Sequence, residues 1–171
     1  YGAKFTSFAG RVYPFDRMID MGDNPYNPIL PTYCSIDFGF RMPAVGWFQT
    51  YMINGVWHVN MIDEYLHHER ISTDDLLQVI KGKNAMYKTL HTFGDPAGVA
   101  MQSSSGMSDI EKFRQHGIIV RFVRDKISRK LVEGISHLRN FIENANGERF
   151  LHLNKNCIGM AEDLENYRYP E

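Results

Sequence analysis

The chain has 171 residues, enough for one domain with a sizeable hydrophobic core. Its composition, 43% hydrophobic and 23% charged residues, is ordinary for a soluble globular protein. No apolar run approaches the ~20 residues that a membrane-spanning helix needs, and a net charge of −1 excludes a uniformly basic nucleic-acid binder.

The first part of the chain, residues 1–31, is rich in Gly, Pro, Asn and Asp. We expect an irregular lead-in with one short strand near Gly10–Tyr13, because the prolines between Gly22 and Pro31 exclude a helix or a central strand. The chain begins with Tyr1 and not with Met, so we expect a piece of a longer protein.

Three strands should follow. Asn54-Gly55 is a strong signal for a tight hairpin, which places antiparallel strands on both sides of it. We expect these strands to cover Thr32–Phe40, Ala44–Ile53 and Val56–Tyr65. We expect their aromatic side chains to fill the core, namely Trp47, Phe48, Tyr51 and Trp57.

Helices and strands alternate in the rest of the chain. Ser72 is a polar cap ahead of two acids, and Ser108 begins an S-x-x-E capping box whose helix Gly117 stops. We expect helices from Ser72 to about Lys83, from Ser108 to His116, over Ser128–Asn144 and over Asn156–Tyr167, and strands over Thr89–Phe93, Ile118–Val123 and Phe150–Leu153. A meander followed by alternating helices and strands predicts an α/β domain with a mixed sheet flanked by helices, the arrangement of a ribonuclease-H-like fold.

The two cysteines, Cys34 and Cys157, lack the paired spacing of a zinc site and are too few for a disulfide scaffold. We expect two half-buried thiols in a reducing compartment.

Two aspartates lie at expected strand ends. Asp37 interrupts an apolar strand, where an unpaired carboxylate would be costly to bury, and Asp95 lies in a turn of small residues that a substrate could approach closely. Each has a plain alternative. Asp37 could face water on an alternating strand, and Asp95 could belong to an ordinary Asp-Pro turn.

Together the two aspartates suggest a metal site. If their strands are central neighbours, both carboxylates emerge at one edge of the sheet, where ligands of open α/β sheets bind. Carboxylate oxygens suit Mg²⁺ or Mn²⁺ and not zinc. Two such ions about 3.5–4 Å apart can activate a water and stabilise the leaving oxygen of a phosphodiester.

Five stretches of the chain resemble, in the same order, those of a known protein family. They are GRVYPFDRMI (10–19), CSIDFGF (34–40), TFGDPAG (92–98), SDIEKFRQHGIIVRFVRDK (108–126) and AEDLENYRYPE (161–171). In this order they resemble the C-terminal nuclease domain of the large terminase subunit of tailed bacteriophages. The resemblance covers nearly the whole chain and implies a single ribonuclease-H-like nuclease domain over residues 1–171, with its core in residues 32–171.

The resemblance also implies roles for the acids. Asp37 matches the family's first catalytic, metal-binding aspartate, and Asp95 matches the second. The family's third acid lies on a helix beyond the last matching stretch, so we expect it after Glu171, and a chain that ends there lacks part of the metal site. Within the chain, Glu64 or its neighbour Asp63 is a candidate substitute at the end of the third strand, although an exposed strand end explains both acids as well.

A basic stretch, residues 121–130, carries five basic side chains against one acid. Lys126 matches a lysine of the family and is expected to meet a DNA phosphate, with Arg124, Arg129 and Lys130 as further candidates. The alternative for each residue is a solvated helix start.

The function that the resemblance implies is that of a metal-dependent endonuclease, which uses two Mg²⁺ or Mn²⁺ ions to cut concatemeric double-stranded viral DNA during genome packaging. An ATPase domain would precede Tyr1, the portal protein and the small terminase subunit would be partners, and the host cytoplasm would be the location, with no membrane involved. Two alternatives stay open. One is another ribonuclease-H-like nuclease of the resolvase or integrase type, and the other is a DNA-binding module without catalysis.

Overall fold

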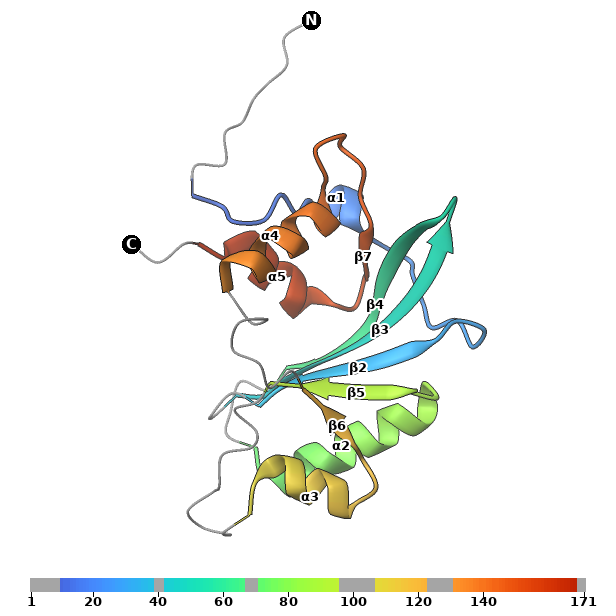
Figure 1. Cartoon of the computed structure of the whole chain (residues 1–171), viewed down its shortest axis with the longest axis vertical. Helices are drawn as coiled ribbons and strands as arrows, with labels where there is room; N and C mark the ends of the chain where they lie inside the picture. The colour runs from blue at the N-terminus through green and yellow to red at the C-terminus, as the bar shows by residue number, and fades with distance from the viewer. Residues whose placement is uncertain (1–9, 39–41, 67–70, 96–106, 123–130, 169–171) are drawn as a thin grey trace, which may run out of the picture.

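The computed structural model describes residues 10–38, 42–66, 71–95, 107–122 and 131–168. Its centre is one mixed sheet of seven strands in the order β1-β7-β4-β3-β2-β5-β6, with helices on both faces (Figure 1). Within these ranges, no helix is long and apolar enough to cross a membrane.

The sheet joins an antiparallel meander to parallel strands. The strands are β1 (Met21–Gly22), β2 (Thr32–Asp37), β3 (Ala44–Ile53), β4 (Val56–Leu66), β5 (His91–Gly94), β6 (Val120–Arg121) and β7 (Leu151–Asn154). Strands β2, β3 and β4 pair antiparallel, and the hairpin between β3 and β4 turns at Asn54 and Gly55, both with positive φ as its sequence predicts. Strand β5 pairs parallel with β2 and β6 with β5, while β7 pairs parallel with β4 and β1 with β7.

The helices are α1 (Arg17–Asp20), α2 (Thr73–Met86), α3 (Asp109–Gln115), α4 (Leu131–Ile142) and α5 (Ile158–Asn166). The predicted caps are confirmed: the Ser72 hydroxyl accepts from Asp75 N, and Ser108 and Glu111 form a complete capping box. Gly117, at φ +83°, follows the end of α3 as predicted.

A hydrophobic cluster lies on each face of the sheet. Helices α2 and α3 cover one face, where they bury a group that includes Ile36, Trp47, Ile80 and Phe113. Helices α4 and α5 cover part of the other face, over β4 and β7, and bury a group that includes Met61, Ile142, Leu153 and Leu164. The strand side chains in these two clusters are internal, so a functional site on the sheet must be built from strand side chains outside them.

Part of the expected irregular lead-in is ordered structure. Residues 17–22 form α1 and β1, and β1 extends the sheet beside β7. The strand expected near Gly10–Tyr13 is reduced to an isolated bridge between Arg11 and Arg168. The local sequence carries no sign of these pairings, because the partners lie more than 120 residues away.

Other boundaries differ by a few residues. Helix α2 continues to Met86, three residues past the expected end, and the strands expected over Thr89–Phe93 and Ile118–Val123 shorten to β5 and β6. Trp57 was expected in the core, but it is 55% exposed because no described element covers this end of the β3–β4 hairpin.

The cysteines are more deeply buried than expected, since Cys34 and Cys157 are both 0% exposed. Burial raises the pKa of each thiol to about 12, with the Glu64 and Asp63 charges adding to the rise for Cys157. At pH 8 we therefore expect neither thiol of the folded chain to react with Ellman's reagent, and both to react in urea.

The same burial gives a pH dependence of stability. Above the ordinary thiol pKa of 9.0, unfolded thiols lose their protons while the folded ones keep them until about pH 12, so the free energy of unfolding should fall from pH 8 to pH 10. Urea unfolding at the two pH values measures the change. A wild-type slope equal to that of a Cys34→Ala/Cys157→Ala chain would show that the thiols contribute nothing.

Candidate functional site

Asp37 and Asp95 occupy equivalent positions at the ends of two neighbouring parallel strands. Asp37 is the last residue of β2, and Asp95 directly follows β5. Ile36 is in register with Gly94, and Asp95 N donates a hydrogen bond to Ile36 O at 3.2 Å, which continues the pairing by one residue. The condition on which the metal prediction depended, that the two strands be neighbours, is therefore met.

Both aspartates also leave the sheet on the same face. Ile36 is buried in the α2/α3 core, so the next residue, Asp37, points to the opposite face. At Gly94, a Cβ atom would point at Val120 in the same core, which directs Asp95 to the opposite face as well. Both residues are exposed, as a site open to solvent and substrate requires.

The pair is not completed by a third ligand in the described part of the chain. Among those residues, no group of three or more His, Cys, Asp or Glu side chains converges as a metal site would require. Two carboxylates alone leave most of the six coordination positions of Mg²⁺ to water or to other groups.

Glu64, the candidate substitute, has a different partner. Strand β3 separates β4 from β2, and the Glu64 carboxylate accepts hydrogen bonds from Gly159 N at 2.7 Å and from Met160 N at 2.9 Å. These N–H groups belong to the first turn of α5, whose positive dipole end favours a carboxylate. Gly159 permits the contact, because a Cβ there would lie 1.9 Å from Leu66 Cδ1.

This geometry predicts a structural role for Glu64. Glu64→Gln should lower the free energy of unfolding by about 1–2 kcal/mol, because one of two charge-assisted hydrogen bonds is lost. Mn²⁺ affinity should stay unchanged, and urea unfolding with a Mn²⁺ titration checks both. The matched control is Glu162→Gln on the exposed side of α5, which should alter neither. A loss of Mn²⁺ binding with unchanged stability would instead make Glu64 a metal ligand.

Asp63 points to the opposite face from Glu64. Asp63 is buried, at 8% exposed, and its carboxylate binds the Lys83 ammonium, the Tyr87 hydroxyl at 2.7 Å and Asn156 Nδ2 at 3.3 Å. Burial, and then the bond to Asp63, raise the pKa of Tyr87. Asp63 therefore connects α2 to β4, and among the described residues its hydrogen-bond partners do not include Asp37 or Asp95.

The basic candidates Arg124, Lys126, Arg129 and Lys130 lie outside the described residues. The first residue of their stretch, Arg121, is described: it is exposed at the end of β6 and in register with Phe93. That register puts Arg121 on the face of the sheet that carries Asp95.

The sequence did not reveal that this face is partly uncovered. Tyr33, Thr50, Trp57 and Phe93 line a shallow apolar hollow across β2 to β5. Phe93, which is 42% exposed, directly precedes the Gly94–Asp95 pair. The two aspartates therefore border an apolar sheet face that the described helices leave open.

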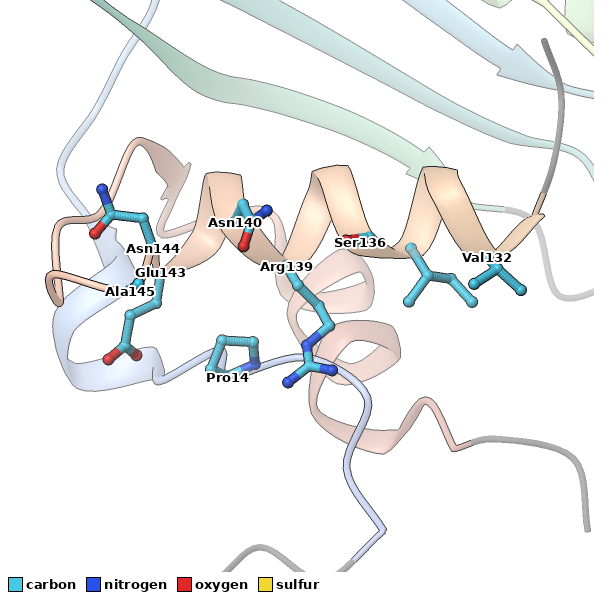
Figure 2. A pocket seen from close by; sticks show the side chains of 9 residues that line it. Pro14, Val132, Ser136, Arg139, Asn140, Glu143, Asn144 and Ala145 are labelled. Atoms are coloured by element: carbon cyan, nitrogen blue, oxygen red, sulfur yellow. The ribbon is translucent and has the colours of Figure 1, made fainter.

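A second hollow lies elsewhere. Figure 2 shows it between one side of α4 and the segment that contains Pro14, with Arg139 and Asn140 among its lining residues. Neither aspartate lines it, so it is separate from the carboxylate pair.

A mixed sheet of this order, with helices on both faces, defines a ribonuclease-H-like domain. The fold is similar to that of the large terminase nuclease domain of phage P22, with a TM-score of 0.67 and 12% identity over 94% of this chain and 80% of that one. It is also similar to the large terminase nuclease of the thermophilic phage G20c, with a TM-score of 0.61 and 17% identity over 86% and 70% of the chains.

A third similar structure is the g2p (large terminase) nuclease domain of bacteriophage SPP1 with bound Mn, with a TM-score of 0.58 and 13% identity over 89% and 81% of the chains. At these identities the likeness establishes a shared fold. No protein-family model matches the sequence, and no curated protein matches it.

Proposed function

We propose that this chain is the nuclease domain of a phage large terminase, a metal-dependent endonuclease that cleaves double-stranded DNA. The observation that carries the proposal is the placement of Asp37 and Asp95 on one face at neighbouring parallel strand ends. The shared fold with three terminase nuclease domains supports it, and the Mn bound to the SPP1 domain supports divalent metal use.

Asp37 and Asp95 are the residues that would hold the metal. Both are exposed oxygen donors, the type that Mg²⁺ and Mn²⁺ prefer. The chemistry that two bound ions supply is activation of a water for attack on the phosphorus and stabilisation of the leaving 3′ oxygen, which leaves a 5′ phosphate. The work of the protein is to fix the two carboxylates on rigid strand ends, so that the ligand positions exist before DNA binds.

A third acid, which we propose follows Glu171, would complete the ligand set. The exposed Phe93 ring, two residues before Asp95, supports this proposal, because it leaves room for a further element to pack there.

Lys126, with Arg124, Arg129 and Lys130, would contact the DNA phosphates. The position of Arg121 supports this role. Arg121 is the first residue of the basic stretch, and its register with Phe93 puts its side chain on the face of the sheet that carries Asp95. Contacts of this kind are independent of sequence and weaken with salt.

The biological task that follows is the cutting of concatemeric viral genomes at the start and end of packaging, in the host cytoplasm. An ATPase domain would precede the nuclease in the same polypeptide, and the portal protein and small terminase subunit would assemble with it.

Cleavage of DNA by a longer chain that continues past Glu171 tests the proposal. With Mn²⁺ or Mg²⁺ it should nick and linearise a supercoiled plasmid, leave 5′ phosphates, and stop when EDTA is added. A strong preference for four-way junctions over plasmid would favour a resolvase, and strand joining would favour an integrase-type enzyme. DNA binding without any cutting would favour a non-catalytic module.

A further inference from the structure

Gly94 lies in one of the tightest places in the sheet, directly before Asp95. A Cβ atom on Gly94 would lie 2.7 Å from Val120 Cγ1 and 2.9 Å from Phe38 Cε2, so any side chain there would displace its surroundings. Neither neighbour can give way easily. Val120 is 6% exposed, and the Phe38 ring packs edge-on against buried Phe113 with the centroids 5.6 Å apart.

The crowded contact connects the two strand ends that carry the aspartates. Phe38 directly follows Asp37, and Gly94 directly precedes Asp95. The Phe38 ring occupies the space that a Gly94 side chain would need, and the two residues are each one residue from a carboxylate-bearing position. A side chain at Gly94 would therefore displace groups next to both strand ends.

We infer that Gly94 is a positioning residue of the proposed metal site: because it carries no side chain, Phe38 and Val120 pack over it without displacing the strand ends that carry Asp37 and Asp95. The inference rests on the proposed function. Its physical basis is that metal–oxygen bonds to Mg²⁺ are short, about 2.0–2.1 Å, so a displacement of one strand end by part of an ångström lowers affinity.

Substitution of Gly94 by Ala tests the inference in a chain that continues past Glu171 and so includes the proposed third acid. Mn²⁺ is titrated and the paramagnetic broadening of the Asp37 and Asp95 amide NMR signals is followed. Gly94→Ala should raise the dissociation constant by roughly ten- to a hundredfold, the range seen when support around metal ligands is lost. The dispersion of the NMR spectrum shows whether the variant remains folded.

A rescue variant separates positioning from simple loss of stability. Adding Phe38→Leu and Val120→Ala to Gly94→Ala removes both atoms that the new methyl group would meet. This triple variant should regain most of the Mn²⁺ affinity while it is less stable than Gly94→Ala, because core volume is removed. A purely structural role cannot raise affinity while stability falls.

Two other glycines provide controls. Gly82→Ala has no atom within 4 Å of the added Cβ, whereas Gly159→Ala meets Leu66 on β4, which β3 separates from Asp37, so the second should lower stability and neither should alter Mn²⁺ affinity. If wild type shows no broadening at Asp37 and Asp95, the proposed metal site is wrong and the inference falls with it. If wild type binds Mn²⁺ and Gly94→Ala binds it equally well, or the triple variant regains nothing, this inference alone is wrong.

Discussion

Replacement of Asp37 by Asn, in a chain that continues past Glu171, is expected to slow Mn²⁺-dependent plasmid cleavage by at least about a hundredfold, or roughly 2.7 kcal/mol of transition-state stabilisation. The amide keeps the size of the carboxylate but removes the charge that attracts a divalent cation. Asp95→Asn should have an effect of the same order, because the two residues occupy equivalent strand-end positions.

The losses of cleavage rate in the two single variants should not add when the substitutions are combined. If both carboxylates hold the same ions, the Asp37→Asn/Asp95→Asn chain should be about as slow as the slower single variant. Asp163→Asn, an exposed acid on α5, is the matched control and should cut at the wild-type rate. Wild-type cutting by Asp37→Asn would remove that residue from the mechanism, and fully additive losses would mean that the aspartates act separately.

The largest effect on stability is expected at Arg149, which is the charged partner of a buried acid. The Asp20 side chain is 0% exposed, and its Oδ2 accepts from Arg149 Nη1 at 2.6 Å and from Asp16 N at 2.8 Å. Arg149 also donates to Pro14 O and pairs with Glu143 at the end of α4. Arg149→Met should lower the free energy of unfolding by about 3–5 kcal/mol, because it leaves a buried carboxylate without its counter-charge.

Urea unfolding measures this loss, and a second substitution isolates its cause. Asp20→Asn placed in the Arg149→Met chain should restore part of the stability, since it removes the uncompensated charge. Arg17→Met, which breaks the more exposed pair with Glu165, should cost no more than about 1 kcal/mol. A loss at Arg149 no larger than that at Arg17 would contradict the assigned role of Asp20.

Features governed by neighbouring residues were predictable from the sequence. The Asn54-Gly55 hairpin and the Ser108–Glu111 capping box depend on backbone preferences and hydrogen bonds within a few residues, and both are confirmed. The importance of Asp37 and Asp95 could be stated only on the condition that their strands were neighbours. Local sequence does not determine strand order, so that condition needed the structure.

Features that depend on distant partners were not predictable. Asp20 and Arg149 are 129 residues apart, and β1 pairs with β7 across a similar separation, so the lead-in looked irregular although part of it belongs to the sheet. Glu64 illustrates the same limit at the site. An acid at a strand end suits a metal or a helix N-terminus equally well, and only the approach of α5 through Gly159 distinguishes the two.

Exposure was the other quantity that the sequence left undetermined. Trp47 and Trp57 lie on adjacent strands of similar composition, yet Trp47 is 0% exposed and Trp57 is 55% exposed. The difference arises from which parts of the sheet α2, α4 and α5 cover, and hydrophobic alternation along a strand does not specify that coverage.

Anomalous diffraction from crystals soaked in MnCl₂ would test most directly whether Asp37 and Asp95 bind a metal ion together. We expect a manganese peak about 2 Å from a carboxylate oxygen of Asp37 and also of Asp95, or two peaks that these residues share between them. Manganese bound only elsewhere, or carboxylates too far apart for a cation to bridge, would contradict the proposal that this sheet edge is a nuclease centre.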